Sequence, residues 1–290
     1  MKSGFVAIIG RPNVGKSTIV NEACGHIISI VSPKAQTTRD VIKGIYNDED
    51  SQIIFVDTPG IHKPIHELGK IMNNSALDSI KDVEAIVLVV DASKRFDEQD
   101  KEITESIKSD CPLIIVINKI DLCRIDKVSE IKTKYKELFP KATLIETSAI
   151  DKFNIDGLIN EVKKVLPEGP QYFDKETYSD RDDAFMMKEV IREHILLKVR
   201  QEVPHQCAVV IEKFENTKKE LSINAAIIVE KASQKGILIG KEGKMIKSIG
   251  TSARKELEKI FEKHIYLELF VKVKEDWLNS NRLLKEFGYK

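Results

Sequence analysis

The sequence predicts a doubly wound, mostly parallel α/β domain followed by a smaller α+β domain. Three observations support this prediction. Short continuous runs rich in Val and Ile alternate with segments of helical spacing, a glycine-rich loop follows the first run directly, and the element order changes after a polar stretch near residue 170. Continuous apolar runs are typical of strands buried on both faces of a parallel sheet. A length of 290 residues is enough for two cores.

The first domain is predicted to alternate strand and helix. The expected strands are 5–9, 53–56, 85–90, 113–117 and 143–146, and the expected helices are 16–24, 68–80, 99–109 and 155–166. Alternation of this kind gives a sheet with helices on both faces. The polar motifs described below all follow strand ends, where open α/β sheets bind their ligands.

The domain boundary is predicted at the P-E-G-P sequence of residues 167–170. Proline and glycine end the preceding helix, and the stretch after it has too few apolar residues to pack. We therefore expect a first domain at 1–167, a linker at 168–183 and a second domain at 184–290. The second domain is expected to contain helices 184–200, 244–263 and 278–287 and strands 207–214, 222–229 and 265–273.

A phosphate-binding loop is predicted after the first strand, where the sequence is G-R-P-N-V-G-K-S. Glycines let backbone N–H groups turn toward a phosphate, the lysine reaches the outer phosphates, and the serine hydroxyl can ligate Mg²⁺. The residues expected to contact the nucleotide here are Gly10, Asn13, Val14, Gly15, Lys16, Ser17 and Thr18.

A second motif, Asn118-Lys119-Ile-Asp121, selects the base. The carboxylate of Asp121 can accept two hydrogen bonds from N1–H and the amino group of guanine, and adenine has no such donor pair. Ser148 and Ala149 are expected to approach the guanine O6 atom through their backbone N–H groups. The motifs together predict GTP or GDP as the ligand.

The metal and the γ-phosphate are assigned to D-T-P-G at 57–60 and to T-T-R at 37–39. Asp57 is placed to hold Mg²⁺ through water, and the Gly60 amide is placed to sense a γ-phosphate. Thr38 is the expected second hydroxyl ligand beside Ser17, and Thr37 is the alternative. Mg²⁺ is thus assigned to Ser17, Thr38 and Asp57, and hydrolysis to Lys16, Thr38 and Gly60.

Two positions bear on the rate of hydrolysis. Ile61 stands where many GTPases have a glutamine that orients the attacking water, and its side chain cannot form a hydrogen bond. We therefore expect slow intrinsic hydrolysis. Asn13 is a candidate catalytic residue that would ligate K⁺ where an arginine finger places its charge. The alternative, in which Asn13 only stabilises the turn, remains open.

A G-x-x-G loop in the second domain lies among lysines and opens a helix. Glycines that let a phosphodiester backbone approach a helix N-terminus, with lysines nearby, form a clamp for single-stranded nucleic acid. The alternative is an ordinary solvated basic helix face. The residues expected to contact RNA are Ile239, Gly240, Lys241, Gly243, Lys244, Lys247 and Arg254.

Composition constrains the function less strongly than the motifs do. The formal net charge is zero, with a small acidic excess in 1–181 and a small basic excess in 182–290, which weakly favours an anionic partner for the second half. The four cysteines have no C-x-x-C spacing, so we expect free thiols in a cytoplasmic protein. We find no signal-peptide pattern and no apolar stretch near the roughly 20 residues that span a bilayer.

The strings G-R-P-N-V-G-K-S, T-T-R, D-T-P-G, N-K-x-D and T-S-A resemble the Era family of the TrmE-Era-EngA-like GTPases. So do I-R-E at 191–193, V-P-H at 203–205, I-L-I-G-K-E-G, I-G-T-S-A-R at 249–254 and V-K-V-K-x-D-W at 271–277. Era proteins have a C-terminal type II KH domain. The resemblance implies an assembly factor of the 30S subunit that binds the 3′ end of 16S ribosomal RNA and associates peripherally with the inner membrane. We further expect a monomer. Glu242 inside the G-x-x-G loop departs from the family pattern, and an acid there should weaken RNA binding.

Two other functions are compatible with parts of the sequence. An RNA-binding protein with a purely structural nucleotide pocket would bind GTP without turnover. A GTPase of transfer-RNA modification would need a helical domain with a catalytic cysteine near the C-terminus, and Cys207 lies far from it. Duplicated GTPases are excluded by the single set of motifs. We expect a switch whose GTP form holds RNA and whose hydrolysis releases it.

Overall fold

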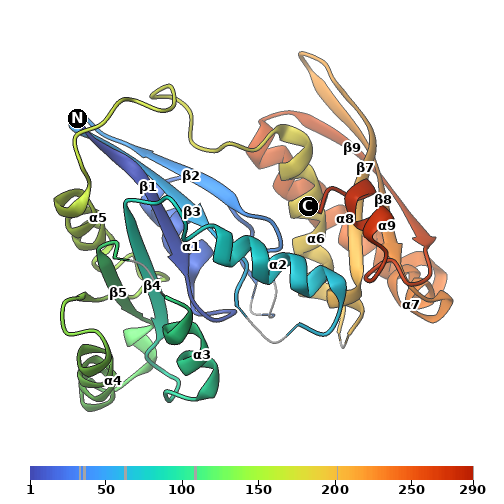
Figure 1. Ribbon diagram of the computed structural model, residues 1–290. Coiled ribbons are helices and arrows are strands. Elements are labelled where there is room, and N and C mark those ends of the chain that lie inside the picture. Colours follow the sequence, from blue (N-terminus) through green and yellow to red (C-terminus); the bar gives the residue numbers. More distant parts are fainter. Residues whose placement is uncertain (33, 35–36, 62–63, 108–109, 201, 290) are drawn as a thin grey trace. The chain divides into compact units, whose positions relative to one another are not determined.

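The computed structural model describes residues 1–32, 34, 37–61, 64–107, 110–200 and 202–289. They form two compact units, each with its own sheet (Figure 1). The first unit consists of Met1–Val31, Thr38–Lys63 and Met72–Asp180. The second consists of Ser32–Thr37, Pro64–Ile71 and Arg181–Lys290.

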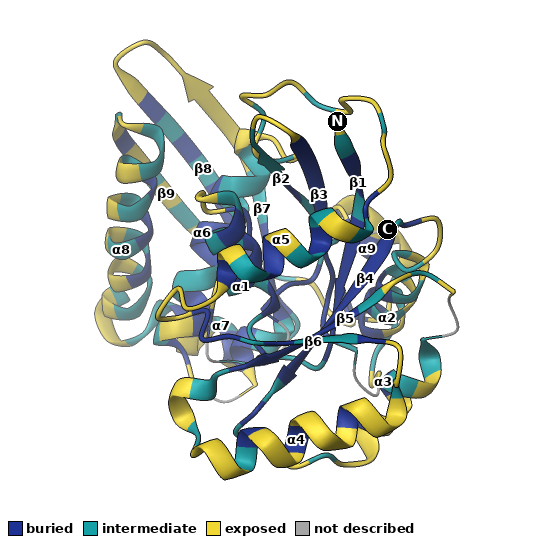
Figure 2. Cartoon of the chain, turned by 90° about the vertical axis from the view of Figure 1, so that its left-hand side faces the viewer, coloured by how far each residue is buried: buried dark blue, intermediate teal, exposed yellow. Residues whose placement is uncertain are grey.

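The first unit is built on a six-stranded sheet in the order β2-β3-β1-β4-β5-β6. All neighbouring strands are parallel except β2, which runs antiparallel to β3. Their bounds are β1 Lys2–Ile9, β2 Ile42–Asn47, β3 Ser51–Asp57, β4 Ala85–Asp91, β5 Leu113–Asn118 and β6 Thr143–Glu146. The central strands are buried almost throughout, as Figure 2 shows in dark blue, because helices cover both faces.

The helices of this unit are α1 Lys16–Cys24, α3 Glu98–Ser106, α4 Ile125–Leu138 and α5 Ile155–Val165, with a 3₁₀ turn at Ile120–Leu122. Helix α2 Glu67–Asp78 begins in the second unit and belongs to the first from Met72 on. Side chains of α3 and α4, including Ile103, Val128 and Ile131, pack in one core cluster with β1, β4 and β5. Helices α1 and α5 contact each other, and α1 also contacts β2 and β3. The predicted doubly wound arrangement is therefore present.

Two elements of this unit were not predicted. Strand β2 is an edge strand with a glycine and with polar residues, so it lacks the continuous apolar run of a central strand. Helix α4 buries Val128, Ile131 and Tyr135 at helical spacing, a pattern that the sequence carries. The predicted helix 99–109 ends at Ser106, and residues 108 and 109 lie outside the described part.

The first part of the expected linker, up to residue 180, packs on the first unit. Residues up to Asp180 cluster with that unit. Gln52 on β3 accepts hydrogen bonds from the amides of Tyr172 and Phe173, and Ser179 forms a β-bridge with Gly44 of β2. Backbone and amide hydrogen bonds hold this stretch, so hydrophobic periodicity could not reveal it.

The second unit has a three-stranded sheet in the order β7-β8-β9, with β8 antiparallel to β7 and parallel to β9. Its elements are α6 Asp183–Lys198, β7 Cys207–Asn216, β8 Glu220–Val229, α7 Ala232–Ile239, α8 Lys244–Phe261, β9 His264–Val273 and α9 Asn281–Glu286, with 3₁₀ turns at Val203–Gln206 and Lys241–Gly243. Helices α6, α7 and α8 share one apolar core with the sheet. Helix α7 was not predicted, because it is short and contains Gly236.

The C-terminal segment is anchored by Trp277. This side chain is fully buried, contacts the rings of Phe287 and Tyr289, and donates from Nε1 to the carbonyl oxygen of Gln206 at 3.3 Å. No helix in the described residues is both long and apolar enough to cross a bilayer.

Candidate functional site

The phosphate loop between β1 and α1 depends on glycine at two positions. Gly10 has φ 145° and Gly15 has φ 102°, in the region that favours glycine. A Cβ atom on Gly15 would lie 2.2 Å from Nδ2 of Asn118, and one on Gly10 would lie 2.3 Å from the carbonyl oxygen of Val89. The loop follows the first strand, as predicted, and fits tightly against the carboxyl ends of β4 and β5.

Lys16 is buried inside this loop. Its Nζ donates to the carbonyl oxygens of Gly10 at 3.1 Å and Arg11 at 2.9 Å. Burial lowers the pKa of Lys16 to about 8, and the nearby carboxylate of Asp57 opposes this shift. The ammonium is thus held ready for an anion whose charge would favour its protonated form.

Ser17, Thr38 and Asp57 converge as the sequence predicted. Ser17 Oγ donates to Asp57 Oδ2 at 2.8 Å and lies 2.9 Å from Thr38 Oγ1. Thr37 differs, because its hydroxyl donates to the carbonyl oxygen of Lys34 at 2.7 Å. The geometry therefore supports Thr38 over Thr37 as the metal ligand.

The donor set fits Mg²⁺, which prefers hard oxygen ligands and keeps several waters. Asp57 is fully buried, and within the described residues no hydrogen-bond donor reaches its Oδ1 atom. Burial raises the pKa of Asp57, while Lys16 and Ser17 oppose the rise. An unpaired buried carboxylate oxygen beside two hydroxyls is what a partly hydrated cation needs. No cluster of three His, Cys, Asp or Glu suited to a metal occurs in the described part of the chain.

Asn118 connects three of the motifs. Its Nδ2 donates to the carbonyl oxygen of Val14 at 2.8 Å, and its Oδ1 accepts from Thr147 Oγ1 at 3.1 Å and from the Ala149 amide at 3.0 Å. The Ala149 amide, predicted to approach guanine, is thus paired with Asn118 in this structure. Asn118 braces the phosphate loop against the T-S-A turn, and Thr147 is a member of the site that sequence reasoning missed.

Asp121 is exposed at the end of the same loop. Ser148 Oγ lies 2.7 Å from Asp121 Oδ1 and 2.9 Å from Asp151 Oδ2, and the Ser148 amide donates to the carbonyl oxygen of Phe153. The carboxylate of Asp121 is therefore oriented by a neighbour while it stays accessible to a base edge. Asp151 carried no recognisable motif in the sequence.

Lys119 links the base loop to the phosphate loop. Its Nζ donates to the carbonyl oxygen of Asn13 and forms an ion pair of 2.8 Å with Asp91. Burial would raise the pKa of Asp91, but hydrogen bonds from Lys119 and Ser93 hold it below its ordinary value. Asp91 was also missed, although it ends an apolar run as Asp57 does.

The remaining nucleotide-site residues lie around this framework. Val14 is buried in the loop, and Thr18 is half-buried in the first turn of α1. Asn13 is exposed with φ 62°. A Cβ atom on Gly60 would lie 2.6 Å from the backbone N of Pro12, and Ile61 packs against the core cluster of α3 and α4. Ile61 therefore has an apolar packing role.

In the second unit the G-x-x-G loop has three left-handed residues, Gly240 at φ 72°, Glu242 at φ 54° and Gly243 at φ 73°. A Cβ atom on Gly240 would lie 2.7 Å from the Cβ atom of Met245. Lys244 Nζ forms an exposed ion pair of 3.1 Å with Glu242. The acid in the loop therefore competes with a phosphate for one of the predicted RNA-binding lysines.

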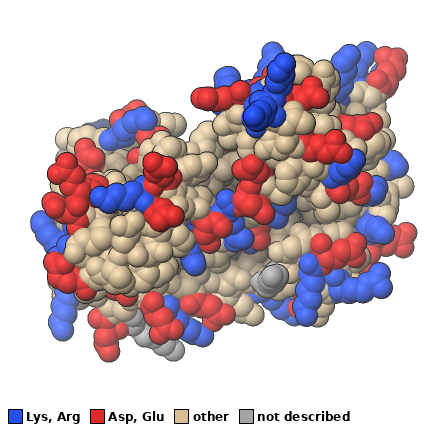
Figure 3. Space-filling view, turned by 90° about the horizontal axis from the view of Figure 1, so that it is seen from above, with Lys and Arg blue, Asp and Glu red and all other residues tan. Residues whose placement is uncertain are grey.

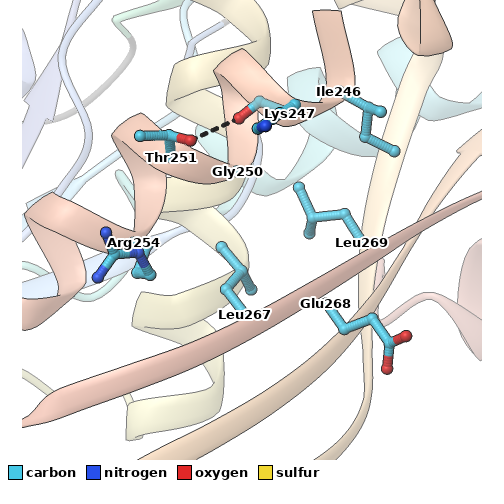
Figure 4. Close-up of a pocket in the computed structure, with 8 residues that line it drawn as sticks. All are labelled: Ile246, Lys247, Gly250, Thr251, Arg254, Leu267, Glu268 and Leu269. Carbon is cyan, nitrogen blue, oxygen red and sulfur yellow. Dashed lines mark hydrogen bonds between the residues drawn. The ribbon is translucent and has the colours of Figure 1, made fainter. Parts of the chain in front are cut away.

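A cavity of about 300 Å³ lies between α8 and β9 (Figure 4). Of the residues predicted to contact RNA, Lys247 and Arg254 line it, whereas Ile239, Gly240, Lys241, Gly243 and Lys244 do not. The residues that sequence reasoning missed are Ile246, Gly250, Thr251, Leu267, Glu268 and Leu269. The sequence carries an amphipathic pattern for the helix and an alternating pattern for the edge strand. Neither pattern shows that the two elements lie side by side and form a groove.

Charges of both signs are mixed on one face of the molecule. On the face seen in Figure 3, Lys and Arg side chains are interspersed with Asp and Glu side chains. Arg254 itself pairs with Glu258 at 2.6 Å. The cavity lining thus combines the cations Lys247 and Arg254 and the carboxylate Glu268 with apolar side chains.

Two family models match the chain. One is described as a 50S ribosome-binding GTPase and matches residues 5–119, and the other is described as a KH domain and matches residues 202–278. The chain is 45% identical over 292 residues to the protein named GTPase Era of Clostridium kluyveri, and the match covers 100% of each.

Solved structures agree with this match. An Era variant of Aquifex aeolicus bound to GDP and aluminium fluoride has a TM-score of 0.96 and 38% identity, covering 100% of this chain and 99% of that one. Era in complex with MgGDPNP and nucleotides 1506–1542 of 16S ribosomal RNA has a TM-score of 0.96 and 37% identity, with the same coverage. The predicted fold class, a P-loop GTPase domain followed by a KH domain, is confirmed.

Proposed function

Because the chain belongs to the Era family of GTPases, we propose that its GTP-bound form holds the 3′ end of 16S ribosomal RNA. Hydrolysis to GDP and phosphate then releases the RNA, and this cycle assists maturation of the 30S subunit. The observation that carries the proposal is one chain with both a guanine-nucleotide framework and an α8–β9 groove lined by Lys247 and Arg254. A relative was solved with a GTP analogue and that RNA together.

We assign the nucleotide contacts from the geometry of the framework. Lys16 neutralises the outer phosphates, Asp121 selects guanine, and backbone N–H groups of the phosphate loop bind oxygen atoms of the nucleotide. Asn118 and Lys119 act by bracing the loops. The full set of assigned residues is Gly10, Asn13, Val14, Gly15, Lys16, Ser17, Thr18, Asp57, Gly60, Asn118, Lys119, Asp121, Ser148 and Ala149.

The metal assignment is Ser17, Thr38 and Asp57. Mg²⁺ bound there supplies neutralisation of charge on the transferred phosphate. The Thr38 hydroxyl would bind Mg²⁺ and the Gly60 amide would bind the γ-phosphate, so the segments that carry them become ordered when GTP is present. Ile61 gives no hydrogen bond to water, which supports slow turnover in the absence of an activator.

On the RNA side we assign the backbone clamp to Ile239, Gly240, Lys241, Gly243 and Lys244, and the groove to Lys247 and Arg254. The left-handed glycines let a phosphodiester backbone approach the start of α8. The Glu242–Lys244 ion pair must open for Lys244 to bind a phosphate, which lowers affinity.

Single-turnover GTP hydrolysis, with and without an RNA that ends in the small-subunit 3′ sequence, tests the proposal. We expect the RNA to accelerate hydrolysis, because RNA contacts and the switch belong to one cycle. An RNA of scrambled sequence is the control. Equal rates with all three samples would contradict a functional link and would favour a GTPase whose RNA groove serves another purpose.

The same assay in potassium and in sodium decides the role of Asn13. Faster hydrolysis in potassium, lost in Asn13→Ala, would support a K⁺ ligand. Equal rates in both salts would leave Asn13 as a residue that stabilises the turn at φ 62°.

Other expectations stay predictions. They are a cytoplasmic protein, a monomer, peripheral association with the inner membrane, and domain limits at 1–167 and 184–290. Sedimentation with anionic vesicles and size-exclusion chromatography with light scattering would test the membrane and monomer expectations directly.

A further inference from the structure

Two short segments of the N-terminal half cluster with the C-terminal region. Ser32–Thr37 and Pro64–Ile71 form the second unit together with Arg181–Lys290. The first segment ends directly before Thr38, and the second follows the D-T-P-G motif. Both belong to the parts of a GTPase that order around a γ-phosphate.

Arg192 on α6 holds the first segment. It is fully buried, and its Nε donates to Oε1 of Glu189 at 2.9 Å. One of its terminal nitrogens also donates to the carbonyl oxygen of Thr37. A guanidinium has fixed donor directions, so the carboxylate of Glu189 orients Arg192, and Arg192 in turn fixes the peptide that joins Thr37 to Thr38.

Lys34 adds a second contact to the same helix. Its Nζ donates to the carbonyl oxygen of Val199, the residue that caps the C-terminal end of α6. Carbonyl groups at a helix C-terminus lack intrahelical donors and carry partial negative charge, so a cation is favoured there. Helix α6 therefore binds this segment through both Lys34 and Thr37.

The start of α2 is completed by the C-terminal segment. The amide of Glu67 donates to Oδ1 of Asn279 at 3.3 Å, and the amide of Leu68 donates to the carbonyl oxygen of Leu278 at 3.1 Å. The first amides of a helix have no intrahelical acceptor, and a neighbouring residue usually supplies one. Here a side chain 212 positions later supplies it. Asp276 accepts from Nδ2 of Asn279 at 2.7 Å, which turns Oδ1 toward α2.

We propose that Arg192 and Asn279 are positioning residues for GTP hydrolysis. Arg192 places Thr38 through the Thr37 peptide, and Asn279 sets the first turn of α2. This inference rests on the proposed role of Thr38 as a magnesium ligand. The C-terminal region then contributes to the geometry of the switch as well as to RNA binding.

Three variants test the inference. Arg192→Leu combined with Glu189→Leu removes both charges, so that neither is left buried without a partner. Asn279→Ala removes the acceptor at an exposed position, and Asn279→Asp keeps an acceptor oxygen. Lys198→Leu, on the same helix as Arg192, is the matched control.

Single-turnover GTP hydrolysis is measured over a series of Mg²⁺ concentrations, with GDP affinity and thermal unfolding for each variant. The double variant is expected to raise the half-saturating Mg²⁺ concentration about tenfold, as loss of a charge-assisted hydrogen bond predicts, and to change GDP affinity less than about twofold. Asn279→Ala should slow hydrolysis about threefold or more, and Asn279→Asp should restore it. Lys198→Leu should match the wild type.

Unchanged hydrolysis and unchanged Mg²⁺ requirement in both Arg192→Leu/Glu189→Leu and Asn279→Ala would overturn the inference. A loss of GDP affinity as large as the change in Mg²⁺ requirement would also overturn the inference, because α6 would then support the whole nucleotide site rather than the position of Thr38. If the double variant fails to fold, Asn279→Ala decides. A wild-type protein whose hydrolysis is independent of Mg²⁺ or of Thr38 would instead count against the proposed function.

Discussion

At the scale of single residues, Lys16 and Asp57 form a charged pair whose burial shapes its chemistry. Burial lowers the pKa of Lys16 to about 8 and raises that of Asp57, and each group partly offsets the shift of the other. The charged forms of such a buried pair are stabilised when phosphates and a cation bind, because Lys16 then lies beside anionic phosphates and Asp57 beside the cation. The nucleotide-free site is therefore prepared for the charge of its ligand.

The lowered pKa of Lys16 predicts that this side chain takes up a proton when GDP binds. Between pH about 8 and the ordinary lysine value of 10.5, the folded chain binds fewer protons at Lys16 than the unfolded chain does, so this group makes the nucleotide-free protein more stable as pH rises. Phosphates favour the ammonium, so GDP binding should take up a proton near pH 9 and almost none near pH 7. Calorimetry in two buffers of different ionisation enthalpy measures the difference, and equal uptake at both pH values would contradict it.

The two switch threonines should differ in their need for Mg²⁺. Thr38→Ala removes a hydroxyl 2.9 Å from Ser17 and should raise the half-saturating Mg²⁺ concentration for hydrolysis about tenfold, because a direct ligand is lost. Thr37→Ala removes the hydrogen bonds that the Thr37 hydroxyl donates to the carbonyl oxygens of Lys34 and Ser32 but leaves the Thr38 hydroxyl in place, so it serves as the matched control. The opposite order, with Thr37→Ala as the sensitive variant, would reassign the ligand.

At the scale of elements, the groove between α8 and β9 depends on a close helix-to-strand approach. Gly250 faces Leu269, and a Cβ atom added to Gly250 would lie 3.4 Å from Cδ1 of Leu269, which is ordinary contact. Lys247 and Arg254 stand on the same helix as Gly250 and line the same cavity (Figure 4). The lining combines apolar side chains with the cations Lys247 and Arg254, so volume and charge should contribute separately to RNA binding in this cavity.

Filling the floor should weaken RNA binding without altering its dependence on salt. Gly250→Leu places a large side chain in a cavity of about 300 Å³ and should lower RNA affinity about tenfold or more, since a base loses its space. The salt slope should stay constant, because no phosphate contact is removed. Gly250→Ala fits the space and should stabilise α8, so it is the control. Titration by fluorescence anisotropy at several salt concentrations measures both quantities.

An unchanged affinity for Gly250→Leu would show that RNA does not enter the groove. A reduced affinity together with a smaller salt slope would show instead that the substitution displaces Lys247 or Arg254. Thermal unfolding of both variants separates these results from a loss of fold.

Sequence reasoning succeeded where chemistry is local and failed where it depends on distant contacts. The bounds of α1 and β6 follow from motif and pattern, and the structure matches both. Strand β2 was missed because an edge strand needs no continuous apolar run. The hydrogen bonds by which Asn118 braces the phosphate loop, and the groove between α8 and β9, could not be predicted from the sequence, because the residues that form them come from separate elements. The packing of residues 168–180 could not be foreseen, because hydrogen bonds rather than a periodic apolar pattern hold this stretch to β2 and β3.

At the scale of the whole molecule, the proposed function links a guanine-nucleotide switch and an RNA groove in one chain. Thermodynamic linkage requires reciprocity: if GTP raises the affinity for RNA by some factor, RNA raises the affinity for GTP by the same factor. The segments Ser32–Thr37 and Pro64–Ile71, which adjoin the stretch with Thr38 and Gly60, cluster with the C-terminal region, and the positioning contacts proposed above would give such coupling a physical route. Coupling in proteins of this kind is typically about 5- to 150-fold.

The most direct test of the central claim is the affinity of the full chain for the 3′ end of 16S ribosomal RNA, measured with a non-hydrolysable GTP analogue and with GDP under the same Mg²⁺ and salt conditions. RNA binding should be tighter by about fivefold or more with the analogue, and RNA should raise the affinity for the analogue by the same factor. Equal RNA affinities in the two nucleotide states would contradict the account.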